Sequence, residues 1–209
     1  MSSYVQLNAS EQKRTRLQEA QVSCQSCSPL RIALWQKGDI IWIYPSMREY
    51  NSYNKQLLTI HSINSTQEYE LIRVQLYNNE SINHAVKVIV QYCDENQKNT
   101  TTFYSPYEKA IICFSDESVT MLGGSMNGLG MNQYAIQQNS QPNHDRLLKQ
   151  LEIGKLPVSW LAQGEVCSTF TLETELAPME LVDGMIWTFH SNSEELVRSL
   201  KNEILSSFL

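Results

Sequence analysis

Residues 69–93, YELIRVQLYNNESINHAVKVIVQYC, carry the clearest structural signal in this chain. In both halves of the stretch, apolar residues occupy every second position: Ile72, Val74 and Leu76, then Val86, Val88, Val90 and Tyr92. Successive side chains of a strand point to opposite faces of a sheet, so the pattern predicts two half-buried antiparallel strands. The polar stretch Asn78-Asn79-Glu80-Ser81 between them has turn chemistry, which predicts that the two strands form a hairpin.

The same two-residue period continues along most of the chain after residue 28. Further strands are expected over residues 30–36, 39–44, 55–62, 107–114, 118–122, 131–137, 165–173 and 184–190. Gln36-Lys37-Gly38-Asp39 predicts a tight hairpin between the first two of these strands. Short strands repeated at this spacing are typical of sandwiches and barrels. We therefore expect a mainly β protein built as an antiparallel β-sandwich.

The middle of the chain, from about residue 55 to residue 137, resembles an immunoglobulin-like sandwich in its strand pattern. The Cys…Trp…Cys framework of true immunoglobulin domains does not accompany this pattern. The resemblance is therefore one of pattern only, and it implies no family.

Two segments follow a helical period instead. A short helix is expected near residues 145–153, where an apolar stripe is followed by Gly154 at the position of a C-cap. A C-terminal helix is expected near residues 193–208, with Ser191 or Asn192 beginning a capping box. The apolar stripe of this second helix consists of Leu196, Val197, Leu200, Ile204 and Phe208. We expect the stripe to dock on a sheet face, and the alternative is a helix that binds a partner.

The length of 209 residues suits one large domain or two small ones. Residues 1–28 contain few apolar side chains, so we expect a polar arm or tail there. A β-sandwich domain is expected over residues 29–140. Residues 141–209 are expected to form a helix–strand–strand–helix segment that packs on the same core.

The net charge of −6 comes from one segment of the chain. Between Glu165 and Glu195 there are seven acidic residues and no Lys or Arg. This segment is either a solvated face or an acidic patch for a basic partner or a cation. The overall excess of acid disfavours nucleic-acid binding, which needs a surplus of Lys and Arg.

No apolar run approaches the roughly 18–20 residues that cross a bilayer, so no membrane span is expected. The N-terminal residues lack the basic start and apolar core of a secretory signal peptide. We therefore expect a soluble protein in the cytoplasm.

The five cysteines are Cys24, Cys27, Cys93, Cys113 and Cys167. An odd number without a secretion signal predicts reduced thiols, and the last three lie in segments where a thiol acts as a small apolar side chain. The spacing of Cys24 and Cys27 admits a metal site or a redox-labile disulfide. A zinc site normally needs a second Cys or His pair, and none occurs at matching spacing. No cofactor is expected.

An aromatic stretch supplies the first candidates for contact with a partner or ligand. Tyr50 and Tyr53 stand beside Asn51 and Asn54 in a polar loop. Apolar rings with polar tips suit protein interfaces, and beside amide side chains they also suit stacking on sugars. The sequence leaves both interpretations open.

The glycine cluster at residues 123–130 supplies the second set of candidates, namely Gly124, Asn127 and Gly128. The cluster fails the templates of the P-loop and of dinucleotide-binding turns. We expect a loop between two strands. Its role is either structural or the contact of backbone amides with a ligand or partner.

The leading functional hypothesis is a non-catalytic, β-rich interaction or assembly protein that binds another protein or itself. No catalytic residue is identified, because no nucleophile elbow and no metal-binding His pair occurs. One alternative is a carbohydrate-binding module that uses the loop aromatics. A second alternative is a small hydrolase or metal enzyme whose site is assembled from His190, Glu194 and remote residues.

Overall fold

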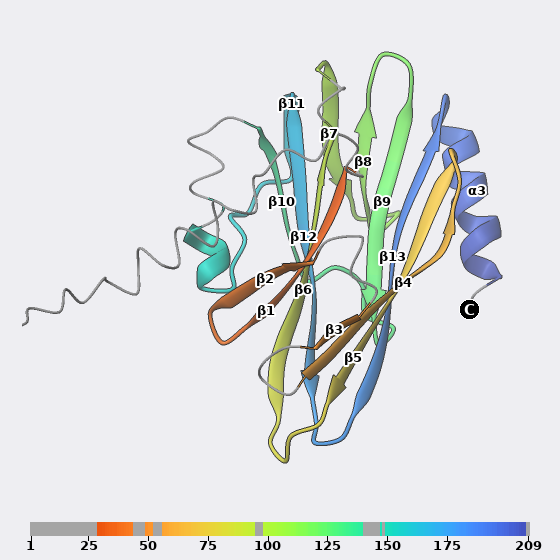
Figure 1. Ribbon diagram of the computed structural model, residues 1–209. Helices are drawn as coiled ribbons and strands as arrows, with labels where there is room; N and C mark the ends of the chain where they lie inside the picture. The colour runs from red at the N-terminus through yellow and green to blue at the C-terminus, as the bar shows by residue number, and fades with distance from the viewer. Residues whose placement is uncertain are drawn as a thin grey trace, which may run out of the picture.

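The computed structural model describes residues 29–43, 49–51, 56–94, 98–139, 147 and 149–207. Two antiparallel sheets pack face to face, which confirms the predicted β-sandwich (Figure 1). One sheet has the strand order β10 (Gln133–Gln138), β12 (Val166–Leu176), β6 (His84–Cys93), β1 (Leu30–Gln36) and β2 (Asp39–Ile43). The other has the order β11 (Leu161–Gly164), β7 (Thr100–Ser105), β8 (Ala110–Phe114), β9 (Val119–Met126), β13 (Leu181–Ser191), β5 (Tyr69–Asn78), β4 (Gln56–Ser65) and β3 (Glu49–Asn51). We call them the five-stranded and the eight-stranded sheet.

The hairpin predicted between β5 and β6 is wrong, because these strands belong to different sheets. β5 pairs with β4 and β13, whereas β6 pairs with β1 and β12. The connection at residues 79–83 therefore crosses between two layers that lie roughly 10 Å apart. The fully buried Asn78 holds this crossing, since its side-chain amide donates to the carbonyls of Ile82, Leu176 and Ala177 at 2.8, 3.2 and 2.9 Å.

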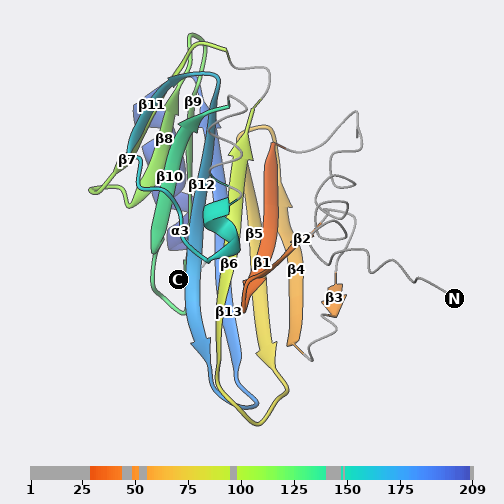
Figure 2. The same ribbon diagram turned by 90° about the vertical axis from the view of Figure 1, so that its left-hand side faces the viewer.

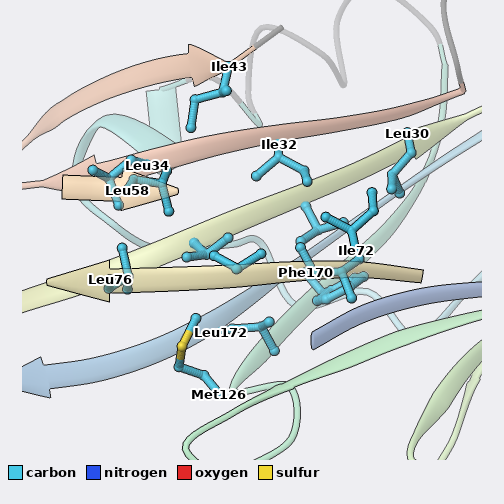
Figure 3. Packing of buried hydrophobic residues seen from close by; sticks show 14 of the residues in the cluster. Leu30, Ile32, Leu34, Ile43, Leu58, Ile72, Leu76, Met126, Phe170 and Leu172 are labelled. Atoms are coloured by element: carbon cyan, nitrogen blue, oxygen red, sulfur yellow. The ribbon is translucent and has the colours of Figure 1, made fainter. Parts of the chain in front are cut away.

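The core lies between the two sheets and is built from the alternating residues that the sequence indicated. Ile72, Val74 and Leu76 of β5 face Val86, Val88 and Val90 of β6. Figure 3 shows Ile32 and Leu34 on one side of Ile72 and Leu76, with Phe170 of β12 beside Ile72 and Leu172 on the other side. Alternation predicted which residues face the opposite sheet, but it did not predict which strands are hydrogen-bonded neighbours, nor that Ile89 and Gln91 on the outer face of β6 are buried as well.

The tight hairpin between β1 and β2 is confirmed. Gln36 and Asp39 are its closing pair, and Lys37 and Gly38 have φ values of 50° and 89°. Two consecutive positive φ angles are the mark of a two-residue hairpin turn whose twist matches that of the strands.

Three strands of the described residues were not predicted, and several predicted strands have different bounds in the structure. The missed strands are β3, β7 and β11, and the predicted strand at 107–114 begins only at Ala110. The glycine cluster also departs from the prediction, because Gly123 and Gly124 belong to β9 and are buried. A Cβ atom at position 123 would lie 2.5 Å from Trp187 Cζ2. These glycines therefore make room for neighbouring side chains rather than for a loop.

Two helices cover the outer faces of the sandwich. α3 (Glu194–Ser206) lies on the eight-stranded sheet, where Val197 packs with Trp187 and Phe189. Its N-cap is Ser193, whose hydroxyl accepts from the Leu196 amide at 3.3 Å, so the predicted caps at residues 191 and 192 are corrected by one or two positions. A short helix that includes residues 149–152 lies on the outer face of the five-stranded sheet (Figure 2).

The last third of the chain contributes a central strand to each sheet. β12 lies between β10 and β6, and β13 lies between β9 and β5. Both sheets thus combine strands from the two sides of residue 140. The division into parts at residues 29–140 and 141–209 stays a prediction.

The segment that leads into β11 joins the two sheets along one side of the sandwich. Ser159 exchanges two hydrogen bonds with Ile136 of β10, at 3.0 Å through its carbonyl and 2.7 Å through its hydroxyl. The next carbonyl, that of Trp160, accepts from the Tyr104 amide of β7 at 3.0 Å. This side is therefore fixed by main-chain bonds to both layers.

Candidate functional site

The predicted aromatic contact residues lie at the edge of the eight-stranded sheet or outside the described residues. Tyr50 and Asn51 belong to β3, where they pair with Leu58 and Leu57 of β4. Tyr53 and Asn54 lie outside the described residues, as do Cys24 and Cys27. A contact role for these side chains stays a prediction.

The glycine cluster is divided between the sheet and a turn. Gly124 is buried, and a Cβ atom there would lie 2.8 Å from the Met185 carbonyl oxygen. Asn127 and Gly128, with φ of 50° and 76°, form an exposed two-residue turn closed by two hydrogen bonds between Met126 and Leu129. The structure therefore separates Gly124 from the other two candidates.

The acidic segment does not gather on one surface, because its two strands belong to different sheets. On β12, Glu173 pairs with Lys87 at 3.0 Å. On β13, Asp183 pairs with Arg73 at 2.8 Å, and this guanidinium lowers the pKa of the Asp183 carboxyl. Several of the acids are thus paired locally with basic residues of neighbouring strands.

His190 of β13 and Glu194 of α3 lie on opposite sides of the eight-stranded sheet. His190 points between the sheets, where its Nδ1 lies 2.9 Å from Thr120 Oγ1. Glu194 begins α3 on the outer face and pairs with Arg198 at 2.6 Å. The structure does not bring these two residues together as a catalytic pair.

Cys93 and Cys167 are joined by a disulfide across the neighbouring strands β6 and β12, with Cα atoms 4.5 Å apart. The prediction of reduced thiols is wrong for this pair. Cys113 is a buried thiol of β8. Within the described ranges, no group of three His, Cys, Asp or Glu side chains is placed to hold a metal ion.

Polar side chains lie between the sheets at one end of the sandwich, where β6 and β13 end. These strand ends are in the upper part of the view in Figure 1. β6 and β12 contribute from the five-stranded sheet, and β7, β8, β9 and β13 contribute from the eight-stranded sheet. We call this group the inter-sheet polar cluster, and its members are Tyr92, Asp94, Thr102, Cys113, Thr120, Ser168 and His190. All of them except Asp94 and His190 are at most 7% exposed.

Burial controls the protonation of the cluster. It raises the pKa of the Cys113 thiol, an effect that hydrogen bonds to Thr102 and Thr100 oppose. Burial also raises the pKa of Tyr92 and lowers that of His190. All three groups are thereby held in their uncharged forms, and a protonated thiol is a poor nucleophile.

The space within the cluster is small. The cavity there measures about 10 Å³, room for roughly one water molecule. A second cavity of about 10 Å³ lies beside Ala135 and Leu147. Neither space admits an organic substrate in the conformation described.

Three exposed apolar side chains lie within four residues of the segment that joins the sheets. Val158, Trp160 and Leu161 are 89%, 64% and 43% exposed. Tyr107, 87% exposed, lies in the turn between β7 and β8, and β7 is the strand that pairs with β11. We call these four side chains the exposed apolar segment.

Sequence reasoning missed both features, although each has a signal. The exposed apolar segment appears as Val158-Ser159-Trp160-Leu161 after a proline, a β-prone run with no predicted partner strand. The signal for the inter-sheet polar cluster is that Tyr92, Thr120 and His190 occupy the same alternate positions as the inward-facing apolar residues of their strands. Only the pairing of the strands shows that these residues meet.

No helix in the described ranges is long and apolar enough to cross a membrane. Comparison of the chain with protein-family models and with curated proteins finds no match.

Proposed function

We propose that this chain is a non-catalytic interaction or assembly protein, and that it binds a protein partner through the exposed apolar segment. The observation that carries the proposal is the exposure of three apolar side chains within four residues of a segment whose backbone bonds to both sheets. Contiguous exposed apolar surface marks interaction sites, and tryptophan is among the residues that contribute most to binding.

The rigidity of the segment adds to the argument. Residues 159 and 160 hydrogen-bond to β10 and β7, so little conformational entropy remains to be lost when a partner packs against Trp160. The Ala135–Ser159 bridge fixes the same region to the five-stranded sheet. Preorganised side chains of this kind suit a docking surface.

The first test is sedimentation velocity over a range of protein concentrations, with Trp160→Ser as the variant and Leu129→Ser as the control. Leu129 is 62% exposed, like Trp160, but it lies in the turn between β9 and β10. If the partner is a second copy, the wild type and the control associate with concentration. The Trp160 variant then stays monomeric at concentrations at least tenfold higher.

A second experiment tests whether the partner is a different protein. A photoreactive amino acid placed at position 160 or at position 129 is irradiated in the native cell extract. We expect a discrete adduct from position 160 and none from position 129. A monomer at every concentration, together with identical adduct patterns from both positions, would overturn the proposal.

Carbohydrate binding is the second candidate, because Trp160 and Tyr107 expose aromatic rings that suit stacking on sugars. A glycan array distinguishes the two functions. A specific glycan signal that disappears in Trp160→Ala favours the carbohydrate function, and an array without signal removes it.

A further inference from the structure

His190 lies at the end of a row of side chains that crosses the eight-stranded sheet. Cys113 pairs with Thr120 across β8 and β9, and Thr120 pairs with His190 across β9 and β13. The His190 ring also lies 6.3 Å from the Tyr92 ring of the facing sheet, measured between ring centroids. The imidazole is therefore held between the two layers of the sandwich.

The groups that face this imidazole come from five places. β6 provides the Tyr92 phenol, β8 provides the Cys113 thiol, and β9 provides the Thr120 hydroxyl. The Asp94 carboxylate follows β6, and Glu70 of β5 lies on the same inner face at the next position along the strands. The uncharged Thr120 and Tyr92 thus lie against the ring, Cys113 lies one strand beyond Thr120, and the two acids lie around these groups.

We propose that protonation of His190 opens the end of the sandwich that holds the inter-sheet polar cluster, and that this end responds to mild acid. An imidazolium carries two N–H donors and a full charge. Here Nδ1 faces a threonine hydroxyl, and the adjoining cavity of about 10 Å³ has room for roughly one water molecule. The ring is partly exposed, so water reaches one side of it, and water on the side of Thr120 and Tyr92 becomes available when β9 and β13 move away from β6 at this end.

The direction of the effect follows from linkage. Burial lowers the pKa of His190 in the folded chain, and the smaller effect of Asp94 opposes it. The unfolded chain therefore binds the proton first. The contribution of His190 to stability is full above pH 6.5 and is lost as the pH falls from there toward its folded-state pKa.

Glu70 has the opposite effect on stability as the pH falls. Burial raises its pKa, so its protonation returns stability at lower pH. The experiment therefore compares pH 7.5 with pH 5.5. At pH 5.5, one unit below the ordinary histidine value, the opening constant rises by at most about tenfold through His190 alone.

Hydrogen exchange and thiol labelling report the opening on the full chain. We expect amides of β9 and β13 near Thr120 and His190 to exchange up to about tenfold faster at pH 5.5, after correction for the intrinsic rate. Cys113 is labelled with 4,4′-dithiodipyridine, a reagent that reacts with thiols in mild acid. Cys24→Ser and Cys27→Ser remove the N-terminal thiols from this measurement, and labelling of Cys113 should accelerate with the same pH dependence.

The variant is His190→Gln and the matched control is His61→Gln, because His61 is an exposed histidine of β4 in the same sheet. The control should keep the acid response and His190→Gln should lose it. NMR titration of the histidine Cε1–H signals in the wild type gives a measurement that needs no variant, and the His190 signal should titrate together with the opening. Equal acid responses in His190→Gln and the wild type, or a His190 signal that titrates without a change in exchange, would overturn the proposal.

Discussion

Gly123 has a different role in the structure from the one that the sequence predicts. In the sequence it begins a glycine cluster that predicts a loop. In the sheet it stands opposite Trp187, whose indole covers the position that a side chain would occupy. The long-range pairing of β9 with β13 decides this, and no local pattern contains that information.

Gly123→Ala should destabilise the fold by about 1–3 kcal/mol, because the Cβ atom overlaps the Trp187 ring and must displace it. The measurement is urea unfolding followed by tryptophan fluorescence. Gly130→Ala is the control, since the nearest atom to its Cβ is 4.0 Å away. Equal midpoints for the two variants would contradict the steric explanation.

At the scale of elements, the sequence predicted most strands and the C-terminal helix because each of these has a local period. β7 was missed because Thr100-Thr101-Thr102 looks polar, although threonine suits strands and the Thr100 hydroxyl donates to the Gly164 carbonyl of the neighbouring β11. The exposed apolar segment was missed because an isolated short run has no period. The docking of α3 was predicted from its apolar stripe, but its ion pairs were not, since they join distant parts of the chain.

Glu108 in the turn between β7 and β8 accepts from Arg198 at 2.7 Å and from Lys201, so it ties α3 to the sheet. Its side chain is only 7% exposed. Glu108→Gln leaves two basic groups without their shared carboxylate and should cost about 1–3 kcal/mol. We expect faster hydrogen exchange throughout α3, whereas the exposed Glu195→Gln should leave it unchanged. Unchanged exchange in the Glu108 variant would show that apolar packing alone holds the helix.

At the scale of the whole molecule, the sandwich class was predictable and the topology was not. The alternation of β5 and β6 gave their inner faces correctly. It could not show that the two strands belong to opposite sheets, because two strands alternate in the same way whether a hairpin joins them within one sheet or a connection joins them across two sheets. The disulfide was missed for a related reason, since only the pairing of β6 with β12 brings Cys93 beside Cys167.

Reduction of the Cys93–Cys167 disulfide should lower the free energy of unfolding by about 2–4 kcal/mol, because the bond closes a long loop in the unfolded chain. Its two cysteines are 74 residues apart in the sequence. Urea unfolding with and without dithiothreitol measures the effect. The double variant Cys93→Ala, Cys167→Ala serves as the control and should not respond to the reductant. Alkylation of both cysteines without prior reduction would contradict the prediction.

The central positions of β12 and β13 have a consequence for synthesis on the ribosome. Arg73 of β5 meets its partner Asp183 only after 110 further residues have been added. At cellular elongation rates this delay is about 5–20 s. During that time β5, β6 and β9 each have an open edge where β12 or β13 will later insert, and such edges recruit other nascent chains. Neither sheet can close before the final third emerges, and we therefore expect the growing polypeptide to need chaperone protection until then.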